Sequence, residues 1–125
     1  MAKHGVTEFL RAFEDVGATF FQIETDLLIC LDEKGNISRV NPAFEKALGR
    51  AESEVLGQGL MRVIAIDDWA SFLRSFTSVN PAPVRMLRKD SGEVTVKLIA
   101  FRFRASRGYL AFRPVKARVR NEPSD

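Results

Sequence analysis

One continuous stretch, residues 27–57, constrains the fold more than any other part of this sequence. It begins with a short apolar run, Leu27–Leu31, and continues through turn residues into Ile37–Val40, where apolar and polar residues alternate. Asn41 is a favourable helix N-cap and Pro42 a favourable first helical residue, because the N–H that proline lacks would be unpaired there anyway. The stretch therefore predicts a β-hairpin that leads directly into a capped helix.

The same stretch also predicts where that helix ends. Phe44 and Leu48 share one face of it, and Gly49 can close it in the left-handed conformation. A second short helix over residues 52–56 is closed in the same way by Gly57. The predicted order is hairpin, capped helix, second helix.

In this order and in these residues, the chain resembles the PAS domain family over residues 27–115. The resemblance implies an α+β fold, in which helices cover one face of a five-stranded antiparallel sheet. It does not indicate a ligand, because PAS domains carry many ligands or none. The residues that carry it are Asp32 and Gly35 in the hairpin, Asn41, Pro42, Ala43 and Phe44 at the helix start, and the pairs Leu48-Gly49 and Leu56-Gly57.

The second half of the chain fits the same fold. After an irregular segment, residues 67–78 show helical spacing of large apolar side chains, as in the long crossing helix that the resemblance implies. Three strands follow, over residues 84–89, 94–103 and 109–115, with turns at 90–92 and 106–108. We therefore predict a flanking helix within residues 1–25, a PAS domain over residues 26–115 and a polar tail over residues 116–125.

The middle strand of these three has an unusual pattern. Strict alternation places Leu98 and Ala100 on one face, and Ile99, Phe101 and Phe103 on the other. Both faces thus become apolar towards the end of the strand. We expect part of the outer face to be covered, by the N-terminal helix or by a partner.

Residues 6–23 predict an amphipathic helix ahead of the PAS domain. Its apolar face can pack on the sheet of its own chain or against a second copy, and PAS domains often dimerise through such a helix. The sequence does not separate these alternatives, and we expect a homodimer. The candidate dimer-interface residues are Phe9, Leu10, Phe13, Val16 and Phe20.

Composition indicates one soluble domain. The chain has 125 residues, of which 46% are hydrophobic and 28% charged. No apolar run approaches the roughly 20 residues that a membrane span needs, and the first residues do not resemble a signal peptide. The single cysteine, Cys30, cannot form an internal disulfide, which fits a reducing compartment. We expect a cytoplasmic protein with no membrane segment.

The net charge of +3 hides an asymmetry. Acids outnumber bases over residues 1–59, whereas residues 94–121 contain bases and no acid. Solvated strand faces with a basic tail explain this pattern, and an anionic partner is the alternative. A small regulatory protein that binds nucleic acid or another polyanion is thus the alternative function, although no recognition motif favours nucleic acid. This basic strip comprises Lys97, Arg102, Arg104, Arg107, Arg113, Lys116, Arg118 and Arg120.

The sequence argues against an enzyme. Its one histidine, His4, stands near the start of the chain, which leaves no internal imidazole for a Ser-His or Cys-His pair. No Cys/His cluster has metal-ligand spacing, and no glycine-rich phosphate loop is present. The flavin-linking cysteine motif of light-sensing PAS domains is missing from residues 57–64, and the helix at 67–78 has no histidine for haem. A coumaryl-type chromophore would lack its loop cysteine. We predict no metal and no cofactor; a non-covalently held flavin stays open, and haem held through Met61, Met86 or Cys30 is disfavoured.

A space between the sheet and its helices is the remaining candidate site. Its wall residues could form a filled core, surround a small apolar or fatty-acid-like ligand, or hold a polar ligand anchored by Arg62 or Arg85. The candidate ligand-binding residues are Ile29, Leu48, Leu60, Ile64, Phe72, Phe76, Met86, Leu98, Phe101 and Tyr109.

The resemblance implies a sensory or signalling module without chemistry of its own. Such a module binds a small molecule, mediates homodimerisation, or does both. It would regulate a histidine kinase, a cyclase or a transcription output, carried by an output domain or partner protein outside this chain. Residues 113–116 lack the Asp-Ile-Thr-like motif that commonly follows a PAS domain in sensors. We expect either a module excised from a larger sensor or a free-standing protein that acts through partners.

Overall fold

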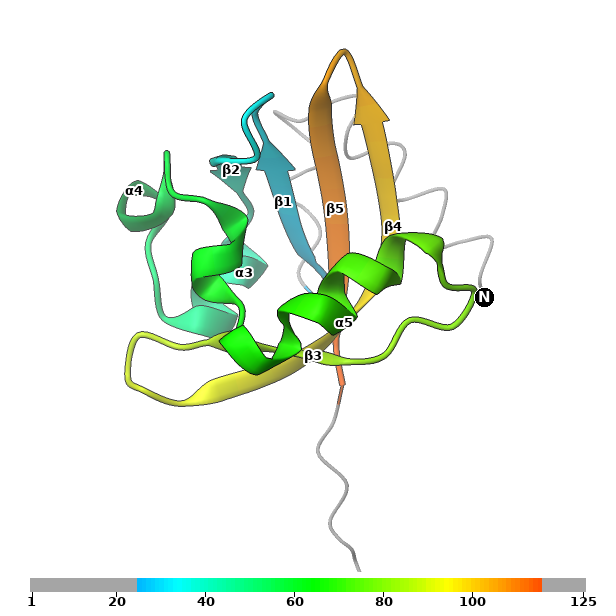
Figure 1. Cartoon of the computed structure of the whole chain (residues 1–125). Helices are drawn as coiled ribbons and strands as arrows, with labels where there is room; N and C mark the ends of the chain where they lie inside the picture. Colours follow the sequence, from blue (N-terminus) through cyan, green and yellow to red (C-terminus); the bar gives the residue numbers. More distant parts are fainter. Residues whose placement is uncertain (1–24, 116–125) are drawn as a thin grey trace, which may run out of the picture.

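The computed structural model describes residues 25–115, which form a five-stranded antiparallel sheet and several short helices (Figure 1). The strand order is β2-β1-β5-β4-β3, so β5 lies in the centre of the sheet. The predicted PAS architecture with its five-stranded antiparallel sheet is confirmed. The strands are β1 (Leu27–Leu31), β2 (Ile37–Val40), β3 (Val84–Leu87), β4 (Glu93–Arg104) and β5 (Arg107–Pro114).

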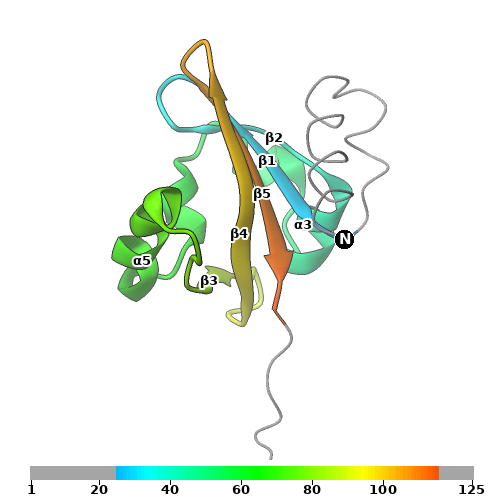
Figure 2. The same cartoon turned by 90° about the vertical axis from the view of Figure 1, so that its right-hand side faces the viewer.

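All the helices of the described residues lie in the connection between β2 and β3. Figure 2 shows α5 on one side of the sheet, seen edge-on. The long helix predicted over residues 67–78 is divided into two single-turn 3₁₀ segments and a short α-helix between them. The helical segments are α3 (Pro42–Leu48), α4 (Glu52–Val55), η1 (Leu60–Val63), η2 (Ile66–Asp68), α5 (Trp69–Arg74) and η3 (Ser75–Thr77).

Asn41 joins the start of α3 to the edge of β1. Its side-chain oxygen accepts hydrogen bonds from the backbone N–H of Phe44 at 3.1 Å and of Leu28 at 2.9 Å. Its amide nitrogen donates to the carbonyl of Asp26 at 3.0 Å. Because the two bonds to the N–H groups of Leu28 and Phe44 are buried, these groups have no access to water as a substitute partner. One side chain thus caps a helix and fixes the position of a strand.

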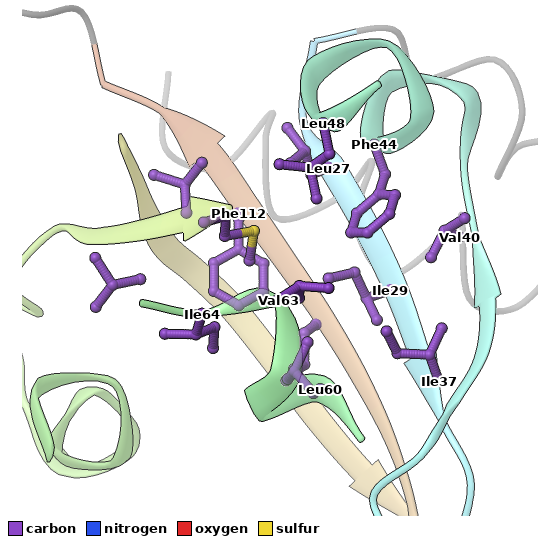
Figure 3. Packing of buried hydrophobic residues seen from close by; sticks show 14 of the residues in the cluster. Leu27, Ile29, Ile37, Val40, Phe44, Leu48, Leu60, Val63, Ile64 and Phe112 are labelled. Carbon is purple, nitrogen blue, oxygen red and sulfur yellow. The ribbon is translucent and has the colours of Figure 1, made fainter. Parts of the chain in front are cut away.

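The core lies between the sheet and the helices (Figure 3). Ile29 and Leu110 face each other across β1 and β5, and both are fully buried. Phe44 of α3 and Phe112 of β5 are the largest fully buried side chains. At about 25 cal/mol per Å² of buried apolar area, such side chains supply most of the stabilisation of a domain of this size.

A β-bulge in β4 changes which side chains face this core. Leu98 pairs with Phe112, but the next pair is Ala100 with Ala111, so one residue of β4 is left over between them. Beyond the bulge, Phe101 pairs with Leu110 and therefore faces the core side, whereas Ala100 faces away. The strict alternation predicted for this strand is wrong after Leu98.

The β4–β5 hairpin turns one residue earlier than predicted. Its two turn residues, Ala105 and Ser106, both have positive φ angles, 51° and 66°. Gly108 lies within β5, opposite Phe103. A Cβ on Gly108 would lie 3.0 Å from Cε1 of Phe103, so the glycine makes room for that ring. The turn is a two-residue hairpin loop of the kind that normally takes Asn-Gly.

Replacing Ala105 and Ser106 by Asn and Gly is expected to stabilise the protein. Left-handed backbone costs an ordinary residue roughly 1–2 kcal/mol, and Asn and Gly pay less of it. Both positions are exposed, so no packing is lost. We expect the free energy of unfolding to rise by about 1 kcal/mol in urea titration. An unchanged or lower midpoint would contradict this hairpin geometry.

Candidate functional site

The interior residues predicted to surround a ligand mostly belong to one packed cluster. Their side chains pack together with the other buried side chains of the core, among them Phe112 and Val63 (Figure 3). Phe76 packs against this cluster and is partly buried. The cluster therefore has the composition of a filled core. The predicted wall residues that belong to it are Ile29, Leu48, Leu60, Ile64, Phe72, Met86 and Leu98.

Phe101 and Tyr109 depart from the predicted wall. Phe101 faces the helix side but is 41% exposed, so it lies at the rim of the core. Tyr109 packs on the opposite face of the sheet, and its assignment to the wall is wrong. Because Leu110 faces the core, its neighbour Tyr109 must face away from it. The alternation of residues 109–112 in the sequence already contained this signal.

A row of phenylalanines runs from the core to the surface. The ring centroid of Phe72 lies 6.0 Å from that of Phe112 and 5.2 Å from that of Phe76. Phe76 in turn lies 4.9 Å from Phe101 and 5.8 Å from Phe103, edge-on or tilted, as aromatic pairs prefer. Phe103 is 59% exposed. Sequence reasoning missed this row, because it depends on the bulge that brings Phe101 and Phe103 to the helix side.

The face of the sheet away from α5 carries a second apolar cluster. Leu28, Cys30 and Ala111 are buried there, and partly buried side chains surround them. Burial raises the pKa of the Cys30 thiol to about 12, so this thiol is not a nucleophile. We call this cluster the second sheet face; its partly buried members are Ile99, Ala100 and Tyr109.

The described bases of the basic strip flank the second sheet face at its two ends. Lys97 pairs with Arg113 across the strands at one end, and Arg104 pairs with Arg107 at the other. Arg102, opposite Tyr109, stands beside the second pair. Arg113 forms hydrogen bonds of 3.0 and 3.1 Å with the carboxylate of Asp26, which neutralises part of the first group. The remaining bases of the strip, Lys116, Arg118 and Arg120, lie outside the described residues.

The predicted N-terminal helix also lies outside the described residues. This applies to all the candidate dimer-interface residues, Phe9, Leu10, Phe13, Val16 and Phe20.

Asp68 and Arg85 form the most extensive ion pair of the described residues. The carboxylate accepts from Nε of Arg85 at 2.9 Å, from Nη2 at 3.0 Å and from the Arg85 backbone N–H at 2.8 Å. These bonds fasten η2 to β3. They hold the pKa of Asp68 below its ordinary value of 3.8. Arg85 is thus engaged within the fold rather than directed at a ligand.

Asp68→Asn is expected to lower stability by about 1 kcal/mol at neutral pH, because the pair is partly exposed. A carboxyl whose pKa is lowered by folding stabilises the protein above its unfolded-state pKa, and this contribution is lost as the pH falls through the folded-state pKa. The difference between wild type and variant should therefore shrink as the pH falls below 3.8. Urea titrations at several pH values test this, with Asp67→Asn as the matched control. A difference that is constant with pH would contradict the role of the ion pair.

Two further properties concern the described residues only. Over residues 25–115, no three His, Cys, Asp or Glu side chains come together in a way that could hold a metal ion. Within the same range, no helix is long and apolar enough to cross a membrane.

Comparison with known proteins decides the family. The family model for the PAS fold matches residues 18–98, well over half of the chain. The chain belongs to the PAS family. No curated protein matches this PAS protein significantly.

Solved structures show the same fold at low sequence identity. A domain of a sensory box sensor histidine kinase/response regulator from Geobacter sulfurreducens has a TM-score of 0.61 at 20% identity, covering 83% of this chain and 96% of that chain. The PAS domain of an HTR-like protein from Haloarcula marismortui has 0.55 at 24% identity, covering 87% and 99%. The chromophore-binding domain of an unusual bacteriophytochrome from R. palustris has 0.60 at 17% identity. That match covers 72% of this PAS chain but only 30% of the bacteriophytochrome chain.

Proposed function

We propose that this PAS domain is a non-catalytic, cytoplasmic signalling module that works by associating with a second copy of itself. It passes its signal to an output domain or partner outside this chain, such as a histidine kinase, a cyclase or a transcription regulator. The similarity to a domain of a sensor histidine kinase supports this role. The observation that carries the proposal is the second sheet face, which is apolar although α3 and α5 pack on the other side.

The second sheet face has the properties of an association surface. Leu28 and Ala111 are each only 1% exposed and are thus already covered, so the members that a second copy can contact are the partly buried Ile99, Ala100 and Tyr109. Among the described residues, the charges on β4 and β5 stand at its two ends, and Arg39, opposite Cys30 on β2, is paired with Glu52 at 3.6 Å. Ile99 and Ala100 can therefore be desolvated without burying an unpaired charge. We propose that the predicted N-terminal helix, from this chain or from the second copy, completes the surface.

The packed interior supports association over ligand binding. Ile29, Leu48 and Met86 are all fully buried among other side chains of the core. A small apolar ligand would have to displace these contacts, which are worth roughly 1–3 kcal/mol for each large side chain. We therefore rank a bound apolar ligand second.

Ile99→Asp tests the proposed surface. A carboxylate there would have to be buried, unpaired, when two copies associate. We expect the dimer dissociation constant in sedimentation equilibrium to rise by at least about tenfold. Leu73→Asp is the matched control, because Leu73 is 60% exposed on α5, on the other side of the sheet. Equal association of both variants and wild type, or a wild-type monomer, would contradict the proposal.

Phe9→Asp and Phe13→Asp extend the same test to the predicted N-terminal helix. Both variants should weaken the dimer if this helix contributes to the interface. An unchanged sedimentation profile for both would remove the helix from the interface and leave the second sheet face to be judged by Ile99→Asp.

Polyanion binding remains the alternative function. Arg102, Arg104 and Arg107 come together at one end of the β4–β5 hairpin, which gives this alternative its support. It requires an affinity for single-stranded or duplex nucleic acid that falls steeply with salt. No binding at low salt would end it.

A further inference from the structure

A pocket of about 370 Å³ lies at the C-terminal end of α5. The chain turns back from there towards β3 (Figure 1). It is separate from both the packed interior and the second sheet face, because it shares no lining residue with either. Its volume lies within the roughly 300–1,000 Å³ that is typical of small-molecule sites. The lining residues are Ser71, Arg74, Ser75, Thr77, Ser78, Asn80, Pro81 and Ala82.

Two hydroxyl groups of the pocket are used by the backbone at the helix end. The Ser75 hydroxyl donates to the carbonyl of Ser71 at 3.0 Å, and the Thr77 hydroxyl donates to the carbonyl of Arg74 at 3.3 Å. Carbonyls at a helix C-terminus carry partial negative charge and disfavour anions. These two carbonyls already accept hydrogen bonds from hydroxyl groups, so their electrostatic repulsion of an anion is weaker.

The other polar groups of the pocket retain protons to donate. The Ser71 hydroxyl oxygen accepts from Nη2 of Arg74 at 3.4 Å, and the Ser78 hydroxyl oxygen accepts from the backbone N–H of Asn80 at 3.1 Å. The side-chain oxygen of Asn80 accepts from Nζ of Lys97 at 3.1 Å. Because each of these oxygens acts as an acceptor, the hydroxyl protons of Ser71 and Ser78 and the amide N–H groups of Asn80 can serve a ligand.

The charges around the pocket also favour an anionic ligand. Arg74 brings a permanent positive charge, and none of the eight described lining residues carries a carboxylate. Lys97 adds a second cation next to Asn80. A guanidinium group beside several uncharged donors matches the planar or tetrahedral oxygens of a small anion. We propose that this pocket binds a small carboxylate- or phosphate-bearing molecule through Arg74, Ser71, Ser78 and Asn80.

Amide chemical shifts of the whole chain, followed by NMR during titration, test the site. Phosphate, acetate and malonate are added separately, with chloride used to keep the ionic strength constant. We expect saturable shifts centred on residues 71–82 with at least one of the three anions, and the preferred anion identifies the ligand class. Arg74→Gln should raise the dissociation constant by at least about tenfold. Arg62→Gln is the matched control, because Arg62 is an exposed arginine outside the pocket, and it should leave binding unchanged.

A second variant fills the pocket without changing its charge. Ala82 is exposed and lines the pocket, so Ala82→Trp should abolish the saturable shifts while the fold is kept. No saturation by any anion in the wild type, or equal affinities in wild type, Arg74→Gln and Ala82→Trp, would overturn the proposal. Arg74 lies away from the second sheet face, so dimerisation and anion binding can fail independently.

Discussion

Phe112→Ala is expected to lower the free energy of unfolding by about 3–5 kcal/mol, the usual cost of removing a buried aromatic ring. Phe112 is fully buried on the central strand β5, where its ring stacks 6.0 Å from that of Phe72. The cavity would open in the middle of the core, between strands that cannot close without breaking the sheet. Urea unfolding followed by circular dichroism measures the loss.

Phe103→Ala is the matched control for this substitution. It removes the same ring from the outer end of the phenylalanine row, where the ring is 59% exposed. We expect a loss of about 1 kcal/mol or less, because little of this side chain leaves water on folding. Equal losses for the two variants would contradict the placement of the core.

Asn41→Ala is expected to cost about 2–4 kcal/mol. It removes a helix cap, worth about 1 kcal/mol, and leaves the buried N–H of Leu28 without an acceptor, which costs about 1–3 kcal/mol more. The contact between Asn41 and the Asp26 carbonyl is lost as well. The measurement is again the free energy of unfolding in urea.

Asn41→Ser separates the two roles of this side chain. A serine hydroxyl can cap α3 through the N–H of Phe44, but it is too short to serve Leu28 in the same way. We expect its stability to lie between those of wild type and Asn41→Ala. If serine restored wild-type stability, the bond to β1 would contribute nothing and the link between helix and strand would have to be abandoned.

The first half of the fold could be predicted because its signals are local. The hairpin turn, the Asn41-Pro42 start and the Gly49 end of α3 each act within a few residues, and the structure has them at the predicted positions. Gly49 has φ 65°, the left-handed conformation that its role as a helix end requires. Local backbone chemistry needs no knowledge of distant contacts.

The sequence predicted an apolar outer face on β4, but the exact members of the second sheet face and of the rim of the core depend on non-local pairing, which the sequence did not predict. The register of β4 against β5 decides that a residue is left over next to Leu98, and this moves Phe101 and Phe103 to the helix side. Periodicity alone cannot locate such a bulge, because both faces of β4 are apolar at that point. The position of Tyr109 is different, because the alternation of residues along β5 already places it on the face opposite to Leu110.

The pocket beside α5 could not be predicted for a third reason. Its lining residues are ordinary turn and helix-end residues, and Asn80, Pro81 and Ala82 read only as a helix stop. They line one pocket together with residues of α5, because the chain turns back against this helix. A pocket of this kind is formed by the path of the backbone, which no sequence motif indicates.

A native mass spectrum of the purified protein at low micromolar concentration tests the central claim most directly. We predict a dimer at twice the bare chain mass, because we propose that the second sheet face joins two copies and that side chains fill the core. A dimer that carries a reproducible extra mass, retained in Arg74→Gln and therefore not bound in the pocket beside α5, would contradict the filled core and give the weight of a ligand. A bare monomer would contradict self-association, and with it the proposed mode of signalling.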